Sequence, residues 1–225
     1  MILLSDKWRS TYPQASLGIL AMGNVSNPQH HEGLAAHKET LERALRERYA
    51  GYDRELLKSH PVLAAYNAYY KHFKKTYHVQ LQLESIAFKG KSLPSVAALV
   101  EAMFMAEMKN LMLTAGHDLD MVEPPVTINV AEGHETYVKF NGQEQTLKAK
   151  DMHISDTLGI LSSIIYGPDQ RTQIKPSTER VLFTVYGPPG LDRTDLRAHI
   201  NDIRENVLVV SPDAEVELLE VYSAQ

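Results

Sequence analysis

The chain of 225 residues contains no cysteine, which excludes disulfide bonds, thiolate metal ligands and a cysteine nucleophile. It also lacks a long apolar run, because the longest one, residues 96–105, is interrupted by Glu101. A transmembrane helix needs about 20 consecutive apolar residues, so none is expected. The first six residues have no basic segment and too short an apolar run for a signal peptide. We therefore expect a cytoplasmic protein with no membrane partner.

The chain also has fewer basic than acidic residues. The chain has 23 Lys and Arg residues against 28 Asp and Glu residues, which gives a net charge of −5. Strong non-specific nucleic-acid binding requires many phosphate-neutralising cations, so a DNA partner is not expected, although a local basic patch is compatible with this balance. The chain contains neither Gly-x-Ser-x-Gly nor Gly-x-Gly-x-x-Gly. We expect no cofactor and no metal.

Hydrophobic periodicity predicts mainly helices in the first half of the chain. A mostly apolar segment, residues 16–25, is typical of a buried strand. Apolar residues then recur on one side of residues 33–49, and again after Pro61, as in amphipathic helices. A third helix is predicted from about Pro94 to Leu111, with Ser92 as a possible cap.

The second half is predicted to be rich in strands. Asn141-Gly142 is a strong signal for a hairpin with a type I′ turn. Helices followed by a β-rich block favour an α+β fold over alternating βαβ units. The predicted strands are residues 126–130, 136–140, 143–147, 152–155, 159–166, 180–186 and 215–222, with a helix at 194–206 before the last one.

A set of motifs from Ser92 to Val185 occurs in an order typical of one known domain. The motifs are Lys89-Gly90-Lys91-Ser92-Leu93-Pro94 before a helix, Leu113 to Asp120 after it, Ile128 to Glu135, Asn141-Gly142, Asp156, Gly159 to Gly167, and Thr178 to Thr184. In order and spacing, this set resembles the B3/B4 editing domain of the phenylalanyl-tRNA synthetase β subunit.

The resemblance implies a layered β/β/α sandwich with mixed sheets. We expect one B3/B4-like domain over residues 1–225, with an N-terminal strand and amphipathic helices (1–80) before the core (81–225). The family's editing site hydrolyses tyrosine from mischarged phenylalanine tRNA, and it uses small residues, a Thr and a Glu. That Glu corresponds to Thr184 here, and a Phe of the family corresponds to His117. The resemblance therefore implies a pocket with a different specificity, or one without activity.

The first candidate site is the segment Thr114–Asp120, which we expect to be a loop. His117 has a side-chain pKa near neutrality and could position a water molecule or a ribose hydroxyl, so we assign catalysis to His117, Asp118 and Thr114. Gly116 and Asp120 would contact the substrate. The alternative is a loop whose Asp side chains accept hydrogen bonds from the backbone.

The second candidate site follows a buried strand that contains two serines. The turn after this strand would present Arg171 outward, where its planar guanidinium could bind a phosphate or a carboxylate. The alternative is a hydrogen-bonded pair in the core followed by an ordinary turn. The proposed substrate-binding residues are Ser162, Ser163, Tyr166, Gly167, Asp169, Arg171 and Thr172, together with Thr184.

Lys71, Lys74 and Lys75 form the best candidate RNA-binding surface, because they stand beside several tyrosines that could stack on bases. The alternative is a solvated helix end with the aromatic residues in the core.

The sequence thus leads to two main hypotheses. The first is a trans-acting aminoacyl-tRNA deacylase that does not aminoacylate, with tRNA or aminoacyl-tRNA as its partner and a pocket between the two candidate segments. In this enzyme, oxyanion stabilisation would contribute most to hydrolysis. The second is a non-catalytic module that binds RNA or an amino-acid-like small molecule. An interaction protein that has inherited only the scaffold is a further possibility.

Overall fold

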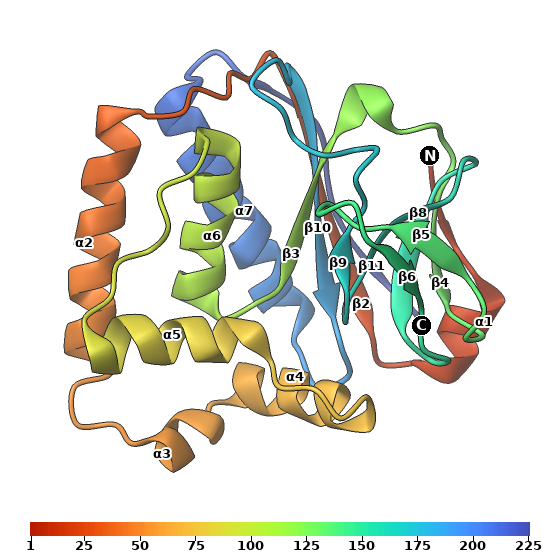
Figure 1. Cartoon of the computed structure of the whole chain (residues 1–225), viewed down its shortest axis with the longest axis horizontal. Helices are drawn as coiled ribbons and strands as arrows, with labels where there is room; N and C mark the ends of the chain where they lie inside the picture. The colour runs from red at the N-terminus through yellow and green to blue at the C-terminus, as the bar shows by residue number, and fades with distance from the viewer.

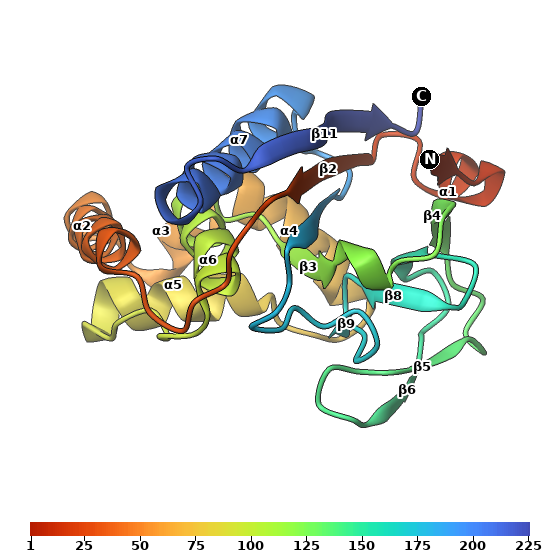
Figure 2. The same cartoon turned by 90° about the horizontal axis from the view of Figure 1, so that it is seen from above.

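The computed structural model describes all 225 residues, which form three layers (Figure 1). A four-stranded sheet stands in the middle, helices cover one of its faces, and a five-stranded sheet with a small hairpin covers the other (Figures 1 and 2). The predicted α+β class and the layered β/β/α sandwich are confirmed. No helix of the structure has the length and apolarity needed to cross a membrane.

The helices are α1 (Asp6–Thr11), α2 (Glu32–Arg48), α3 (Arg54–Lys58), α4 (Pro61–His72), α5 (His78–Lys89), α6 (Ala98–Asn110) and α7 (Arg193–Val210), with a 3-10 turn η1 (Leu119–Met121). The strands are β1 (Ile2–Leu4), β2 (Ser16–Gly23), β3 (Thr114–Asp118), β4 (Val126–Val130), β5 (Thr136–Val138), β6 (Glu144–Thr146), β7 (Met152–Ser155), β8 (Ile160–Ser163), β9 (Gly167–Pro168), β10 (Arg180–Gly187) and β11 (Glu215–Ser223).

The central sheet has the strand order β11-β2-β10-β3, and all its neighbouring strands are antiparallel. All eight residues of β2 are buried, which explains why this segment is apolar without alternation. The second sheet has the order β1-β4-β7-β8-β9, in which β1 pairs with β4 in parallel and the other pairs are antiparallel, so this sheet is mixed as expected. Strand β3 is an edge strand, and the candidate site depends on this position.

One hydrophobic core runs through all three layers and contains 53 buried residues, from Trp8 to Ala224. Helix α7 contributes Leu196, Ile200, Ile203 and Val207, whose spacing puts them on the face toward the central sheet. The core therefore fixes the helical layer and the second sheet against the same central strands.

Three local predictions differ from the structure. Helix α6 begins at Ala98 rather than near Pro94, and Ser92 is exposed and does not cap it. The segment 114–118 is a strand rather than a loop, because β10 pairs with it along its whole length. Helix α5 has no counterpart among the predicted elements.

The predicted hairpin is present, but its turn is longer than a type I′ turn. The Lys139 amide donates to the Gln143 carbonyl (2.9 Å), and the Gly142 amide donates to the Lys139 carbonyl (2.8 Å), which leaves three residues in the turn. Gly142 has a φ of 79°, whereas Asn141 has no positive φ. A type I′ turn requires positive φ at both central residues, so this turn is of the three-residue kind.

The side chain of Tyr186 on β10 connects the two sheets. Its hydroxyl accepts a hydrogen bond from the Ile154 amide of β7 (3.2 Å) and donates one to the Ser162 carbonyl of β8 (3.0 Å). The same hydroxyl lies 2.8 Å from the Ser162 Oγ. Because Tyr186 is only 1% exposed, water does not replace these bonds.

We expect Tyr186→Phe to lower the free energy of unfolding by about 1–3 kcal/mol, because it leaves buried polar groups without a partner. For a chain of this size, that change corresponds to a fall in Tm of roughly 2–4 °C per kcal/mol. Scanning calorimetry measures it, with the half-exposed Tyr52→Phe as the control. An unchanged Tm for Tyr186→Phe would contradict the bridging role.

Candidate functional site

A cavity of about 460 Å³ lies beside the edge strand β3. Its walls come from the helical layer on one side and from the end of β8 and strand β9 on the other. The residues that line it include His78 and Gln82 of α5; Val100, Met103, Phe104 and Glu107 of α6; Leu113, Thr114, Ala115 and Gly116; Phe140; Ser163 to Asp169; Gln173 and Ile174; and Tyr186.

The outer edge of β3 provides backbone hydrogen-bonding groups for this cavity. In an antiparallel strand, alternate residues direct their amide and carbonyl groups away from the paired strand. The Thr114 amide bonds to Glu107 Oε1 (2.7 Å) and the Asp118 amide to the Thr172 carbonyl (2.7 Å), so neither bonds to β10. Gly116 lies between these two residues and therefore turns its amide and carbonyl to the cavity side as well. A Cβ at Gly116 would lie 2.8 Å from Ile174 Cδ1 and 3.2 Å from Met103 Sδ, so the glycine keeps this part of the cavity open.

One face of α6 forms the helical wall. Val100, Met103, Phe104 and Glu107 are spaced by three or four residues and so share one side of the helix. The first three make this wall apolar, whereas Glu107 adds a carboxyl group that is 2% exposed. Its Oε1 accepts the Thr114 amide, and its Oε2 has no hydrogen-bond partner in the protein. Burial raises the pKa of Glu107 from 4.5 to about 8, although the bond from Thr114 opposes this shift.

The Thr114 side chain is oriented by a histidine on α7. Thr114 Oγ1 lies 2.8 Å from His199 Nε2, and the Asn110 side-chain amide donates to His199 Nδ1. Since Nδ1 accepts, Nε2 carries the proton and donates to Thr114. Burial lowers the pKa of His199 to about 4, which agrees with a neutral ring. In this tautomer, the Thr114 hydroxyl proton has no partner within the protein.

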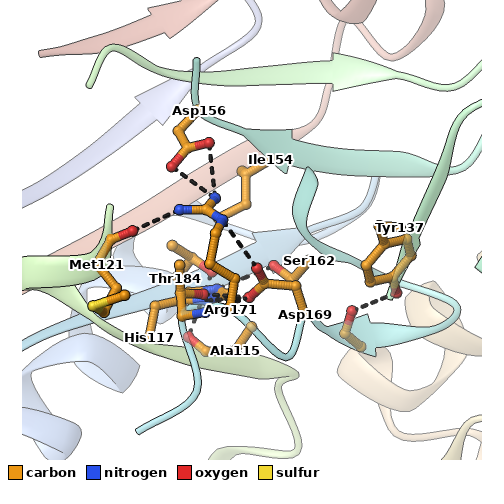
Figure 3. A network of polar contacts seen from close by, with 12 residues as sticks. Ala115, His117, Met121, Tyr137, Ile154, Asp156, Ser162, Asp169, Arg171 and Thr184 are labelled. Atoms are coloured by element: carbon orange, nitrogen blue, oxygen red, sulfur yellow. Dashed lines mark hydrogen bonds and ion pairs between the residues drawn. The ribbon is translucent and has the colours of Figure 1, made fainter. Parts of the chain in front are cut away.

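His117 faces the second sheet and does not line the cavity. Its Nδ1 lies 2.8 Å from Thr172 Oγ1, and its Nε2 lies 3.3 Å from Ser162 Oγ (Figure 3). The side chain is fully buried, and burial, assisted by the charge of Arg171, lowers the pKa of His117 to about 3. These surroundings do not support a catalytic role for His117, because the ring has no access to a bound water molecule.

The two predicted carboxylates of this segment also have other partners. Asp118 Oδ2 accepts from Thr178 Oγ1 (2.8 Å), and its Oδ1 accepts from the Asp120 amide (3.2 Å). Asp120 forms an exposed ion pair with Arg180 (2.8 Å). This geometry agrees with the alternative interpretation, in which these carboxylates organise the local backbone.

Arg171 is also engaged within the protein rather than presented outward. Its guanidinium donates two bonds to Asp156 (2.9 and 2.8 Å) and one to the Met121 carbonyl (2.6 Å; Figure 3). Its Nε lies 3.8 Å from Asp169 Oδ2. The predicted binding of a phosphate or carboxylate by Arg171 is therefore not supported, because the side chain holds the turn after β9.

The two segments predicted to form a pocket do meet at this cavity, but only some of their members line it. The lining members are Thr114, Gly116, Ser163, Tyr166, Gly167 and Asp169, whereas His117, Asp118, Asp120, Ser162, Arg171, Thr172 and Thr184 lie elsewhere. Thr184 is fully buried, with its hydroxyl 3.5 Å from the Ala115 carbonyl. Glu107 was not predicted, and the signal that could have found it is its spacing of three and four residues from Phe104 and Met103.

Phe140 and Tyr166 line the cavity, and Lys75 lies next to Tyr166. Phe140, in the turn between β5 and β6, is 53% exposed, and Lys75 Nζ lies 5.9 Å from the centre of the Tyr166 ring. Lys71, Lys74 and Lys75, at the end of α4 and just after it, are exposed and form no ion pair. The predicted basic surface thus adjoins the cavity through Lys75.

The fold and the cavity together define an α+β sandwich protein with a ligand-sized site at a sheet edge. The chain belongs to the B3/4 domain family, whose model matches residues 64–202. Among solved structures, it is similar to an N-terminal fragment of the phenylalanyl-tRNA synthetase β subunit from Pyrococcus horikoshii, with 11% identity and a TM-score of 0.50. The match covers 96% of this chain and 50% of that fragment, so the chain spans about half its length. No curated protein matches the chain in sequence.

We expect Glu107→Gln to stabilise the protein progressively as the pH rises. With a pKa raised to about 8, folded Glu107 keeps a proton that the unfolded chain releases above pH 4.5. Its contribution to stability is therefore complete below pH 4.5 and is lost as the pH rises to 8. Within this window, the mutant should gain about 1.4 kcal/mol per pH unit relative to the wild type.

Urea unfolding at pH 5, 6, 7 and 8 measures this difference. The exposed Glu47→Gln removes a carboxyl group from the surface of α2 and serves as the control. Parallel stability curves for Glu107→Gln and the wild type would show that Glu107 does not bind the extra proton.

Proposed function

We propose that the protein binds the aminoacyl end of a charged tRNA in this cavity and hydrolyses the ester bond. The observation that carries the proposal is the outer edge of β3, where Gly116 turns an amide and a carbonyl toward an apolar-walled cavity. The similarity to a synthetase β-subunit fragment supports a tRNA partner. The protein would act on tRNAs that another enzyme has charged.

The chemistry of the cavity suits an aminoacyl ester. The Gly116 amide and the Thr114 hydroxyl are hydrogen-bond donors on the same strand, and both are suited to the oxygen of an ester carbonyl. Such donors contribute most when negative charge develops on that oxygen in the transition state. The apolar side chains of α6 would accommodate the side chain of the amino acid.

Hydrolysis itself needs only water in addition to the substrate. A water molecule adds to the ester carbon, the bond from this carbon to the ribose oxygen breaks, and the ribose oxygen takes up a proton from the water. The products are the free amino acid and the uncharged tRNA. A neighbouring ribose hydroxyl of the tRNA would assist the proton transfer.

A second candidate is a module that binds the aminoacyl end without hydrolysis. This candidate is favoured by the acids of the cavity. Burial raises the pKa of Glu107 to about 8, so this carboxyl group is mostly protonated at neutral pH, and the carboxyl group of Asp169 is engaged by Thr172 and Arg171. His117 lies outside the cavity and is not available for this role.

Deacylation assays with tRNAs charged with the full set of amino acids separate the two candidates. We expect selective release by the wild type and a rate lower by roughly 100-fold for Thr114→Val, since loss of one oxyanion donor has this effect in other enzymes. The exposed Thr136→Val, on the hairpin, is the matched control. Release from no tRNA by the wild type would exclude the hydrolase and leave the binding module.

We also expect tRNA binding to depend on the three lysines at the end of α4 and just after it. Replacing Lys71, Lys74 and Lys75 with Gln should weaken tRNA binding and reduce the slope of log K against log salt by about 2, as expected for three phosphate contacts on single-stranded RNA. Filter binding at salt concentrations from about 50 to about 200 mM measures this slope. A triple variant at Lys58, Lys89 and Lys91 removes the same charge elsewhere, and an equal effect of both variants would contradict a local RNA surface.

A further inference from the structure

The ionisable groups that line the cavity are acidic or weakly basic. The lining contains Glu107, Asp169 and His78, but it contains no Lys and no Arg. Lys75 does not line the cavity, and its Nζ lies 5.9 Å from the centre of the Tyr166 ring. The cavity therefore offers no permanent cation to a negatively charged ligand group.

The two carboxyl groups differ in their free hydrogen-bonding capacity. Asp169 Oδ1 accepts from the Thr172 amide (3.2 Å) and from the Thr172 hydroxyl, and its Oδ2 faces the Arg171 guanidinium. Glu107 has no cation near it, and its Oε2 makes no hydrogen bond in the protein. A carboxyl oxygen that lines a cavity and has no partner in the protein is a natural contact point for a donor on a ligand, and an ammonium group there would stabilise the charged form of Glu107 and release its proton.

We propose that Glu107 binds the ammonium group of the ligand, and that the cavity selects amino acids whose carboxyl group is esterified or amidated over free amino acids. This inference rests on the proposed function and specifies which chemical group of the aminoacyl end is recognised. It adds a specificity determinant in the helical layer, on α6.

The selection follows from the cost of burying charge. An ammonium group would pair with Glu107, whereas a free carboxylate would be buried beside two acids with no cation to neutralise it. An ester or amide carries no such charge, and its carbonyl would accept from the Gly116 amide or the Thr114 hydroxyl. Val100, Met103 and Phe104, on the same face of α6 as Glu107, would favour an apolar side chain next to the ammonium group.

Isothermal titration with stable probes tests this inference. The probes are L-leucinamide, L-methioninamide and L-phenylalaninamide, each compared with the free amino acid and with the N-acetylated amide. We expect at least one amide to bind the wild-type protein 10-fold or more tightly than both of its counterparts. Glu107→Gln preserves the acceptor for the Thr114 amide and should lose the preference for the amide over the N-acetylated amide.

The exposed Glu47→Gln should keep the wild-type preference, and thermal unfolding confirms that each variant is folded. Equal binding of amide and free amino acid, an unchanged preference in Glu107→Gln, or no binding of any amide would overturn the inference. Its failure is distinguishable from that of the hydrolase. Glu107-dependent binding without tRNA deacylation would exclude only the hydrolase activity. Deacylation with no ammonium preference would exclude only the proposed role of Glu107.

Discussion

The contact of Tyr186 with β7 and β8 fixes the distance between the two sheets, and the candidate site depends on that distance. Through Ser162, this contact continues to His117, and from His117 to the Thr172 hydroxyl (Figure 3). The Thr172 carbonyl then accepts the Asp118 amide at the end of β3. One buried polar chain thus holds both β3 and the β8–β9 turn, which are two walls of the cavity.

The cavity itself results from how the edge of β3 is covered. An exposed strand edge presents unpaired amides and carbonyls, and proteins usually protect them. Here Glu107 takes the amide of Thr114 and Thr172 takes the amide of Asp118, so that both ends of the strand are paired. The amide of Gly116, in the middle, is not covered in this way and remains directed to the cavity.

Most of the fold could be predicted from the sequence because its hydrophobic pattern is strong, as in the mostly apolar segment of β2 and the apolar stripes of α2 and α7. Strand β3 could not, since Thr-Ala-Gly-His-Asp has little β propensity and becomes a strand only through pairing with β10. For the same reason the sequence indicated a segment that adjoins the cavity but favoured members that do not line it. His117 and Asp118 have the more reactive side chains, yet only the structure reveals which residues face the cavity.

The same limitation explains why Glu107 was missed. The family resemblance directed attention to a strand position, occupied here by Thr184, where it implied a Glu. Thr184 is buried against Ala115 and does not line the cavity, whereas the acid that does comes from α6. A carboxyl group in the helical layer lies beside the apolar wall and the Thr114 amide, so it approaches a ligand from a different direction than a strand residue would. Moving one acid between layers could therefore change which ligand group is recognised while the fold stays the same.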